Sequence, residues 1–141
     1  MKSFAFVAVA LAVDLARRSA PWRALTVALA YGLSMLASTA LKDVVRRPRP
    51  SGEHLVPLPH SWSFPSGHAT SAFAAAVALG LLVPRARWPA LVLAALIAYS
   101  RVYLGVHYWT DVLAGAALGA LVGWLVARAV LKNLSRNPSW S

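Results

Sequence analysis

The sequence predicts an all-α fold, an integral membrane helical bundle of about five transmembrane helices. Hydrophobic residues make up 59% of the 141 residues and charged residues only 13%, whereas typical soluble domains hold about 45–50% and 25%. The apolar residues are gathered into long runs, and prolines and arginines collect between these runs. The length fits a single domain, residues 1–141.

Five apolar runs supply the candidate helices. They cover residues 4–16, 25–41, 69–83, 88–104 and 108–130. A spanning helix needs about 20 residues, within a range of roughly 17–25. The second, fourth and fifth runs reach this length, and the third reaches it if its helix begins at Ser66. The first run is short and contains Asp14. We expect a short helix there, with a signal peptide as the alternative because Lys2 precedes the apolar core.

Basic residues predict how the helices cross the membrane. Basic residues form three clusters. The first, Arg17, Arg18 and Arg23, follows the first apolar run, and the second, Arg85 and Arg87, follows the third run. The last cluster lies near the end of the chain and consists of Arg128, Lys132 and Arg136. Five helices put all three clusters on one side, which the positive-inside rule makes cytoplasmic. The connection 42–65 then faces outward. It is itself basic, and we attribute its charges to function. Its five prolines predict a stiff, extended loop.

The last apolar run carries a stripe of glycines at every fourth position, Gly115, Gly119 and Gly123. Small residues at this spacing let another helix approach closely. We expect the stripe to pack against a helix of the same bundle rather than to form a dimer seam.

Composition excludes several classes of function. The chain has no cysteine, so it forms neither disulfides nor thiolate metal sites. It has only four acidic residues and no acidic cluster for a two-metal site, so we expect neither a metal nor another cofactor. The net charge is +10, but no basic stripe alternates with aromatics, so we do not expect a nucleic-acid partner.

Two histidines stand out as candidates for chemistry. His107 and Asp111 are four residues apart, which places both on one face of a helix. An aspartate beside one imidazole nitrogen fixes the tautomer and leaves the other nitrogen free to attack phosphorus. His68 lies in the first turn of a helix that begins near Ser66, and Gly67 leaves the backbone amides there open to an anion. Each feature alone also fits an ordinary interfacial histidine or a helix cap.

Three cations suit a phosphate site. Lys42, Arg49 and Arg101 could stabilise the charge that phosphoryl transfer spreads over three oxygens. Arg101 lies inside an apolar run, where charge is costly and usually functional. Lys42 and Arg49 could instead extend to lipid headgroups, and this alternative fits Arg46 and Arg47 better.

Together, these residues form a pattern in three parts. The parts are Lys42 with Arg49-Pro50, Pro65-Ser66-Gly67-His68, and Ser100-Arg101 with His107 and Asp111. At every signature position they resemble K-x6-R-P, P-S-G-H and S-R-x5-H-x3-D, the signature of the type 2 phosphatidic acid phosphatase family. The resemblance spans about half of the chain, and it implies a membrane phosphatase that works through a phosphohistidine.

The resemblance also implies a role for each signature residue. His107 would be the nucleophile and Asp111 would orient it, while His68 would protonate the leaving oxygen and then activate water. Phosphate would be bound by Lys42, Arg49, Ser66, Gly67, Ser100 and Arg101. The catalytic core would be the last four helices, about residues 24–131. The other polar residues of the loop, Glu53, His54 and His60, match no signature position and are interpreted as exposed.

The implied reaction is metal-independent hydrolysis of a lipid phosphate or diphosphate at the extracytoplasmic face of a bacterial plasma membrane. Candidate substrates are polyprenyl diphosphate, phosphatidic acid, phosphatidylglycerophosphate and a polyprenyl-linked sugar phosphate. Vanadium haloperoxidases share the constellation but are soluble, so the apolar runs argue against that class. A non-enzymatic lipid-phosphate-binding or transport protein is the other alternative, and the intact His68, His107 and Asp111 argue against it. The oligomeric state stays open.

Overall fold

The computed structural model describes residues 21–52 and 54–136. They form four α-helices and a 3-10 turn: α2 Pro21–Val45, α3 Gly67–Leu82, η1 Pro84–Ala86, α4 Arg87–Tyr103 and α5 Trp109–Arg136. No strand occurs within these ranges, which confirms the all-α prediction. The run 4–16, expected to form a first helix, lies outside the described residues, as does Glu53. The number of five helices therefore stays a prediction.

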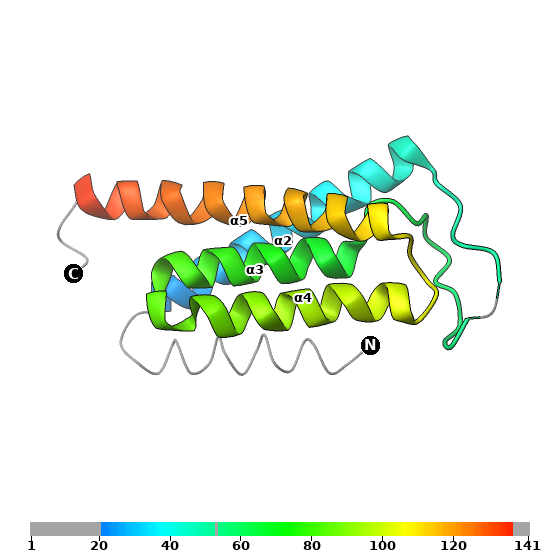
Figure 1. Ribbon diagram of the computed structural model, residues 1–141. Helices are drawn as coiled ribbons and strands as arrows, with labels where there is room; N and C mark the ends of the chain where they lie inside the picture. Colours follow the sequence, from blue (N-terminus) through cyan, green and yellow to red (C-terminus); the bar gives the residue numbers. More distant parts are fainter. Residues whose placement is uncertain (1–20, 53, 137–141) are drawn as a thin grey trace.

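The four helices lie alongside one another in an up-and-down arrangement, with α3 packed against α2, α4 and α5 (Figure 1). The loop 46–66 and the turn 104–108 lie together at one end of the bundle. The start of α2, the turn η1 and the end of α5 lie at the other end. All three parts of the signature therefore meet at the end that carries the long loop.

The glycine stripe of α5 lies directly against α3. A Cβ atom built on Gly119 would lie 2.0 Å from the carbonyl oxygen of Thr70, and one on Gly123 would lie 2.3 Å from that of Ala74. Only glycine permits such close backbone contact. The expectation that the stripe packs within the bundle is confirmed.

Small residues fill the inside of the bundle, and large apolar residues cover its outside. Ala30, Ala74 and Ala127 are fully buried, whereas Leu36 is 69% exposed and Trp88 70% exposed. Within the described residues, α2 and α5 are long and apolar enough to cross a membrane, and α3 is a shorter apolar helix. An apolar exterior over a core of small residues suits a bundle surrounded by lipid.

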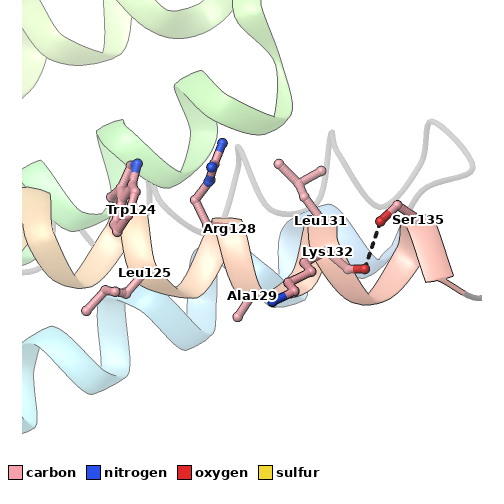
Figure 2. Close-up of a pocket in the computed structure, with 7 residues that line it drawn as sticks. All are labelled: Trp124, Leu125, Arg128, Ala129, Leu131, Lys132 and Ser135. Atoms are coloured by element: carbon pink, nitrogen blue, oxygen red, sulfur yellow. Dashed lines mark hydrogen bonds between the residues drawn. The ribbon is translucent and has the colours of Figure 1, made fainter.

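One hollow of about 550 Å³ lies beside the C-terminal half of α5, between residues that include Trp124, Arg128 and Lys132 (Figure 2). It is at the end of the bundle away from the long loop, and no signature residue lines it. The signature residues therefore lie apart from this hollow, at the opposite end of the bundle.

Candidate active site

Each helix contributes residues of the candidate site from the terminus that lies beside the loop 46–66. Lys42 lies in the last turn of α2, His68 in the first turn of α3 and Arg101 in the last turn of α4. His107 lies just before α5, and Asp111 is in its first turn. Arg49 comes from the loop 46–66, which lies over these helix ends.

His107 and Asp111 form the buried centre of the site. His107 is 5% exposed and Asp111 is completely buried. The Nδ1 atom of His107 lies 3.5 Å from Oδ2 of Asp111. The Ser63 hydroxyl lies between them, since its oxygen is 3.4 Å from Nδ1 and it donates a short hydrogen bond to Oδ2. The backbone N–H of Tyr108 donates to the same oxygen at 3.0 Å.

Arg49 determines which nitrogen of His107 carries the proton. Its Nη1 lies 3.3 Å from Nε2 of His107 and also donates to the carbonyl oxygen of Val106 at 2.7 Å. A guanidinium group only donates hydrogen bonds, so Nε2 must accept with its lone pair and the proton must be on Nδ1. Nδ1–H then faces Ser63 and Asp111. Nε2 is therefore the nitrogen that can act as a nucleophile.

The same surroundings keep His107 uncharged at neutral pH. Burial, together with the positive charges of Arg49 and Lys42, lowers the pKa of His107 from 6.5 to about 4, and Asp111 opposes this shift. A neutral imidazole retains the lone pair that nucleophilic attack requires.

The predicted phosphate-binding cations lie near the two histidines. The charges of Lys42 and Arg49 act on His68 as well as on His107, and the charge of Arg101 acts on His68. Lys42 Nζ donates to the carbonyl oxygen of Trp62 at 2.6 Å, which holds the lysine against the loop. Three positive charges therefore act at His68, and two of them act at His107.

Ser100 supports Arg101 within α4. Its Oγ atom accepts from Nε and Nη2 of Arg101 at 3.1 and 3.0 Å, and its own hydroxyl donates to the carbonyl oxygen of Ile97 at 2.7 Å. The serine thus holds the guanidinium side-on near the end of the helix.

The N-terminus of α3 keeps unused hydrogen-bonding capacity. Ser66 occupies the N-cap position, but its side chain makes no cap hydrogen bond. Its Oγ is buried and has no hydrogen-bond partner among the described residues. A Cβ atom on Gly67 would meet only Ser38 Oγ and Met35 Sδ, at 3.5 and 4.0 Å, so packing does not require glycine there. A free hydroxyl and an open helix N-terminus suit an anion.

Arg47 and Ser63 were missed by the sequence interpretation. Arg47 was expected to extend to lipid headgroups, and this is wrong. Its Nη1 lies 2.9 Å from Oδ1 of Asp111 and donates to Thr110 at 2.6 Å, and its Cζ lies 4.1 Å above the ring of Tyr108. Arg47 precedes Arg49 by two positions and Ser63 precedes Pro65 by two. In an extended chain, residues two positions apart have their side chains on the same side. This spacing was the one feature of the sequence that could have linked Arg47 and Ser63 to the signature.

The other loop histidines lie apart from the centre. His54, expected to be exposed, is partly buried, with Nδ1 3.0 Å from the carbonyl oxygen of Gly105, so it fastens the loop to the turn before α5. His60 is exposed as expected. Within the described residues, no three side chains of His, Asp or Glu gather closely enough to hold a metal ion.

Known proteins share this sequence pattern. A family model described as the PAP2 superfamily matches residues 23–135. The decaprenylphosphoryl-5-phosphoribose phosphatase of Mycobacterium tuberculosis is 40% identical over 122 residues, which cover 82% of this chain and 64% of that protein. Phosphatidylglycerophosphatase B of Bacillus subtilis is 37% identical over 119 residues, 74% of this chain and 57% of that protein. The undecaprenyl-diphosphatase of Sulfolobus acidocaldarius is 35% identical, over 72% of this chain and 52% of that protein. The chain thus spans about half to two thirds of the length of these relatives.

Solved structures share the fold. The crystal structure of a transmembrane PAP2-type phosphatidylglycerolphosphate phosphatase from Bacillus subtilis matches with a TM-score of 0.76 and 34% identity, over 94% of this chain and 71% of that one. Aquifex aeolicus LpxE matches with a TM-score of 0.74 and 30% identity, over 87% and 77%. Sequence and fold agree on the resemblance found in the three-part signature: this membrane protein belongs to the PAP2 superfamily.

Proposed function

We propose that this protein is a metal-independent membrane phosphatase that hydrolyses a lipid phosphate monoester or diphosphate. The observation that carries the proposal is the position of His107 Nε2. Its lone pair faces Arg49 while Nδ1–H faces the Ser63–Asp111 pair. Relatives whose names describe phosphatases of phosphorylated lipids support the same chemistry.

The reaction proceeds in two steps. First, Nε2 of His107 attacks phosphorus, the P–N bond forms and the bond to the lipid oxygen breaks. His68 gives its proton to that oxygen, and Asp111 compensates the positive charge of the phosphorylated ring. Then His68 takes a proton from water, the water oxygen attacks phosphorus and the P–N bond breaks, which releases phosphate.

The remaining signature residues bind the transferring group. Lys42, Arg49 and Arg101 stabilise its oxygens by charge, and both arginines can hold two oxygens at once. Ser66, the amide of Gly67 and Ser100 add hydrogen bonds. These groups act on the charge that spreads over the phosphoryl oxygens in the transition state.

The substrate is a lipid whose phosphate reaches the bundle from the extracytoplasmic leaflet of the plasma membrane. The basic residues at the far end of the bundle support this orientation through the positive-inside rule. The named relatives act on phosphate carried by prenyl or glycerol lipids. Headgroup and tail contacts lie outside the signature, so a substrate panel must choose between these classes.

Phosphate release from such a panel in detergent tests the proposal. We expect release from at least one lipid phosphate or diphosphate, undiminished by EDTA and inhibited by vanadate. His107→Ala should lower kcat by at least about a thousandfold, which corresponds to roughly 4 kcal/mol of barrier. His60→Ala removes a histidine from the exposed part of the same loop and should leave kcat unchanged. Activity that disappears in EDTA and returns with magnesium would contradict the proposal.

The two histidines can be separated by their leaving-group dependence. A general acid matters least when the leaving group is already good. His68→Ala should therefore lose far more activity on a lipid phosphate than on an activated aryl phosphate, whereas His107→Ala should lose both alike. His68→Ala should also accumulate an acid-labile, base-stable phosphoenzyme. Equal leaving-group dependence in the two variants, with no trapped label in either, would remove these role assignments.

A further inference from the structure

A second layer of side chains surrounds the His107–Asp111 pair. Asp111 is completely buried, and both of its carboxylate oxygens are bound by residues outside the signature. Oδ1 pairs with Arg47 at 2.9 Å, while Oδ2 accepts the short hydrogen bond from Ser63 and the N–H of Tyr108. Such a carboxylate is costly to bury unless a cation and hydrogen bonds compensate its charge.

The loop holds Arg47 and Ser63 in register with each other. The backbone N–H of Ser63 donates to the carbonyl oxygen of Arg47 at 2.8 Å, which joins the two arms of the loop above the start of α5. Arg47 is fixed further by Thr110 at 2.6 Å and by the ring of Tyr108. Arg47 therefore makes four contacts, three with the segment 108–111 and one with Ser63. These contacts hold its side chain against the start of α5.

We propose that Arg47 and Ser63 are positioning residues that hold Asp111 as a buried carboxylate and thereby hold His107 with its Nε2 lone pair toward the substrate. Ser63 does this directly, because its oxygen lies 3.4 Å from Nδ1 and its hydroxyl donates to Asp111. Arg47 acts through Asp111, because its guanidinium contacts the buried carboxylate directly, at 2.9 Å from Oδ1. The catalytic consequence of this inference rests on the proposed phosphatase function.

Arg46 provides a matched control for Arg47. It is the adjacent arginine, and its guanidinium Nε donates to the backbone oxygen of Asp43 at 2.9 Å, away from Asp111. Arg46→Gln and Arg47→Gln remove the same charge from the same loop. Arg47→Lys restores the charge without the forked guanidinium.

Steady-state kinetics test the catalytic arm. Arg47→Gln should lower kcat by about 10- to 100-fold, a loss typical of removing a group that orients a catalytic side chain, with KM within about threefold of wild type. Arg47→Lys should recover most of the lost kcat, and Arg46→Gln should match wild type. Ser63→Ala should lower kcat by about tenfold. It removes a single oxygen atom and so provides a test even if Arg47→Gln does not fold.

The carboxylate itself supplies a readout that needs no activity. The chain has only three aspartates, Asp14, Asp43 and Asp111, so the ¹³Cγ signals of labelled aspartate in detergent can be assigned with Asp111→Asn. In Arg47→Gln, the ¹³Cγ signal of Asp111 should move, because the carboxylate loses its direct ion pair and the hydrogen bond to Oδ1. In Arg47→Lys the signal should move less, and in Arg46→Gln it should stay at its wild-type position, because Arg46 is bonded to the backbone of Asp43.

Each pattern of results decides the proposal. A KM that rises more than about tenfold in Arg47→Gln with kcat unchanged would make Arg47 a substrate ligand and overturn it. An unmoved Asp111 signal in Arg47→Gln would also overturn it, as would kcat within about twofold of wild type in both Arg47→Gln and Ser63→Ala. If the wild-type protein released phosphate from no substrate, the proposed function would fail, and the Asp111 signal alone would still decide whether Arg47 holds the carboxylate.

Discussion

The two ring nitrogens of His107 have different neighbours, and this difference leaves one of them with a lone pair that is available for nucleophilic attack. Nδ1 faces Ser63 and Asp111, whereas Nε2 faces the guanidinium of Arg49. Burial and two of the cations that would bind phosphate, Arg49 and Lys42, lower the pKa of His107. A bound phosphate dianion would offset their charge and favour the positively charged ring that the proposed phosphorylation of Nε2 requires.

The first prediction concerns this low pKa. Burial and the charges of Arg49 and Lys42 lower the pKa of His107 from 6.5 to about 4, so the folded protein should take up this proton only near pH 4. Between about pH 6.5 and pH 4, His107 is protonated in the unfolded chain but not in the folded protein. This histidine therefore destabilises the fold as the pH falls through that range. NMR titration of labelled histidine without substrate, assigned with His107→Gln, measures the pKa.

Arg49→Gln should raise the pKa of His107, because it removes a nearby positive charge. Arg46→Gln should leave it unchanged, since the guanidinium of Arg46 is bonded to the backbone of Asp43. A wild-type pKa near that of a free histidine would contradict the geometry in which Arg49 and Lys42 lie beside the ring.

At the scale of single residues, the sequence indicated the members of the candidate site but not their contacts. Lys42, Arg49, His68, His107 and Asp111 could be found because a known motif marks them. The contacts of Arg47 and Ser63 with Asp111 could not be found, because they join positions 64 and 48 residues apart across a proline-rich loop. The two-residue spacing from Arg49 and Pro65 indicates only which side of an extended chain these residues share, and neither it nor hydropathy shows how such a loop folds back over a helix.

At the scale of helices, the contact between α3 and α5 depends on the absence of side chains. Gly119 and Gly123 bring the two backbones together, and this contact places the first turn of α3 beside the first turn of α5. The backbone N–H of Ser66 donates to the carbonyl oxygen of Asp111 at 2.9 Å as a result. Close packing of these helices therefore sets the relative position of His68 and His107.

The second prediction follows from this packing. Gly119→Ala would place Cβ 2.0 Å from the Thr70 carbonyl oxygen, so α3 and α5 must separate, and we expect a loss of about 3 kcal/mol in the free energy of unfolding. Gly32→Ala is the control, since a Cβ there meets nothing within 4 Å. It should change stability little or increase it by up to about 1 kcal/mol. Unfolding in detergent followed by circular dichroism measures both, and equal stabilities would contradict the helix contact.

The helices themselves were largely predictable. The runs 69–83 and 88–104 became α3 Gly67–Leu82 and α4 Arg87–Tyr103, close to their expected bounds. The runs 25–41 and 108–130 became the longer helices α2 Pro21–Val45 and α5 Trp109–Arg136. Hydropathy marks where a chain can contact lipid, whereas a helix continues as long as its backbone hydrogen bonds do, so polar last turns extend beyond the apolar runs.

At the scale of the whole molecule, basic residues gather at both ends of the bundle. Arg85, Lys132 and Arg136 lie at the end that carries η1 and the last turns of α5. Lys42, Arg47 and Arg49 lie at the opposite end, where each binds loop or site atoms. Because both ends are basic, a count of charges alone does not predict which end faces the cytoplasm. The contacts of Lys42, Arg47 and Arg49 distinguish the end that carries the candidate site.

The third prediction is the orientation that this division implies. The basic end without a site should face the cytoplasm, and the loop 46–66 should face the extracytoplasmic side. Ser51→Cys, in the exposed part of the loop, should react with an impermeant thiol reagent added to intact cells, and Asn133→Cys, exposed near the end of α5, should not. Neither change alters a charge, and the native chain has no cysteine to react in the background. After the cells are permeabilised, both variants should react. The reverse pattern in intact cells would place His107 and its cations on the cytoplasmic side, and the substrate would then have to be a lipid phosphate of the inner leaflet.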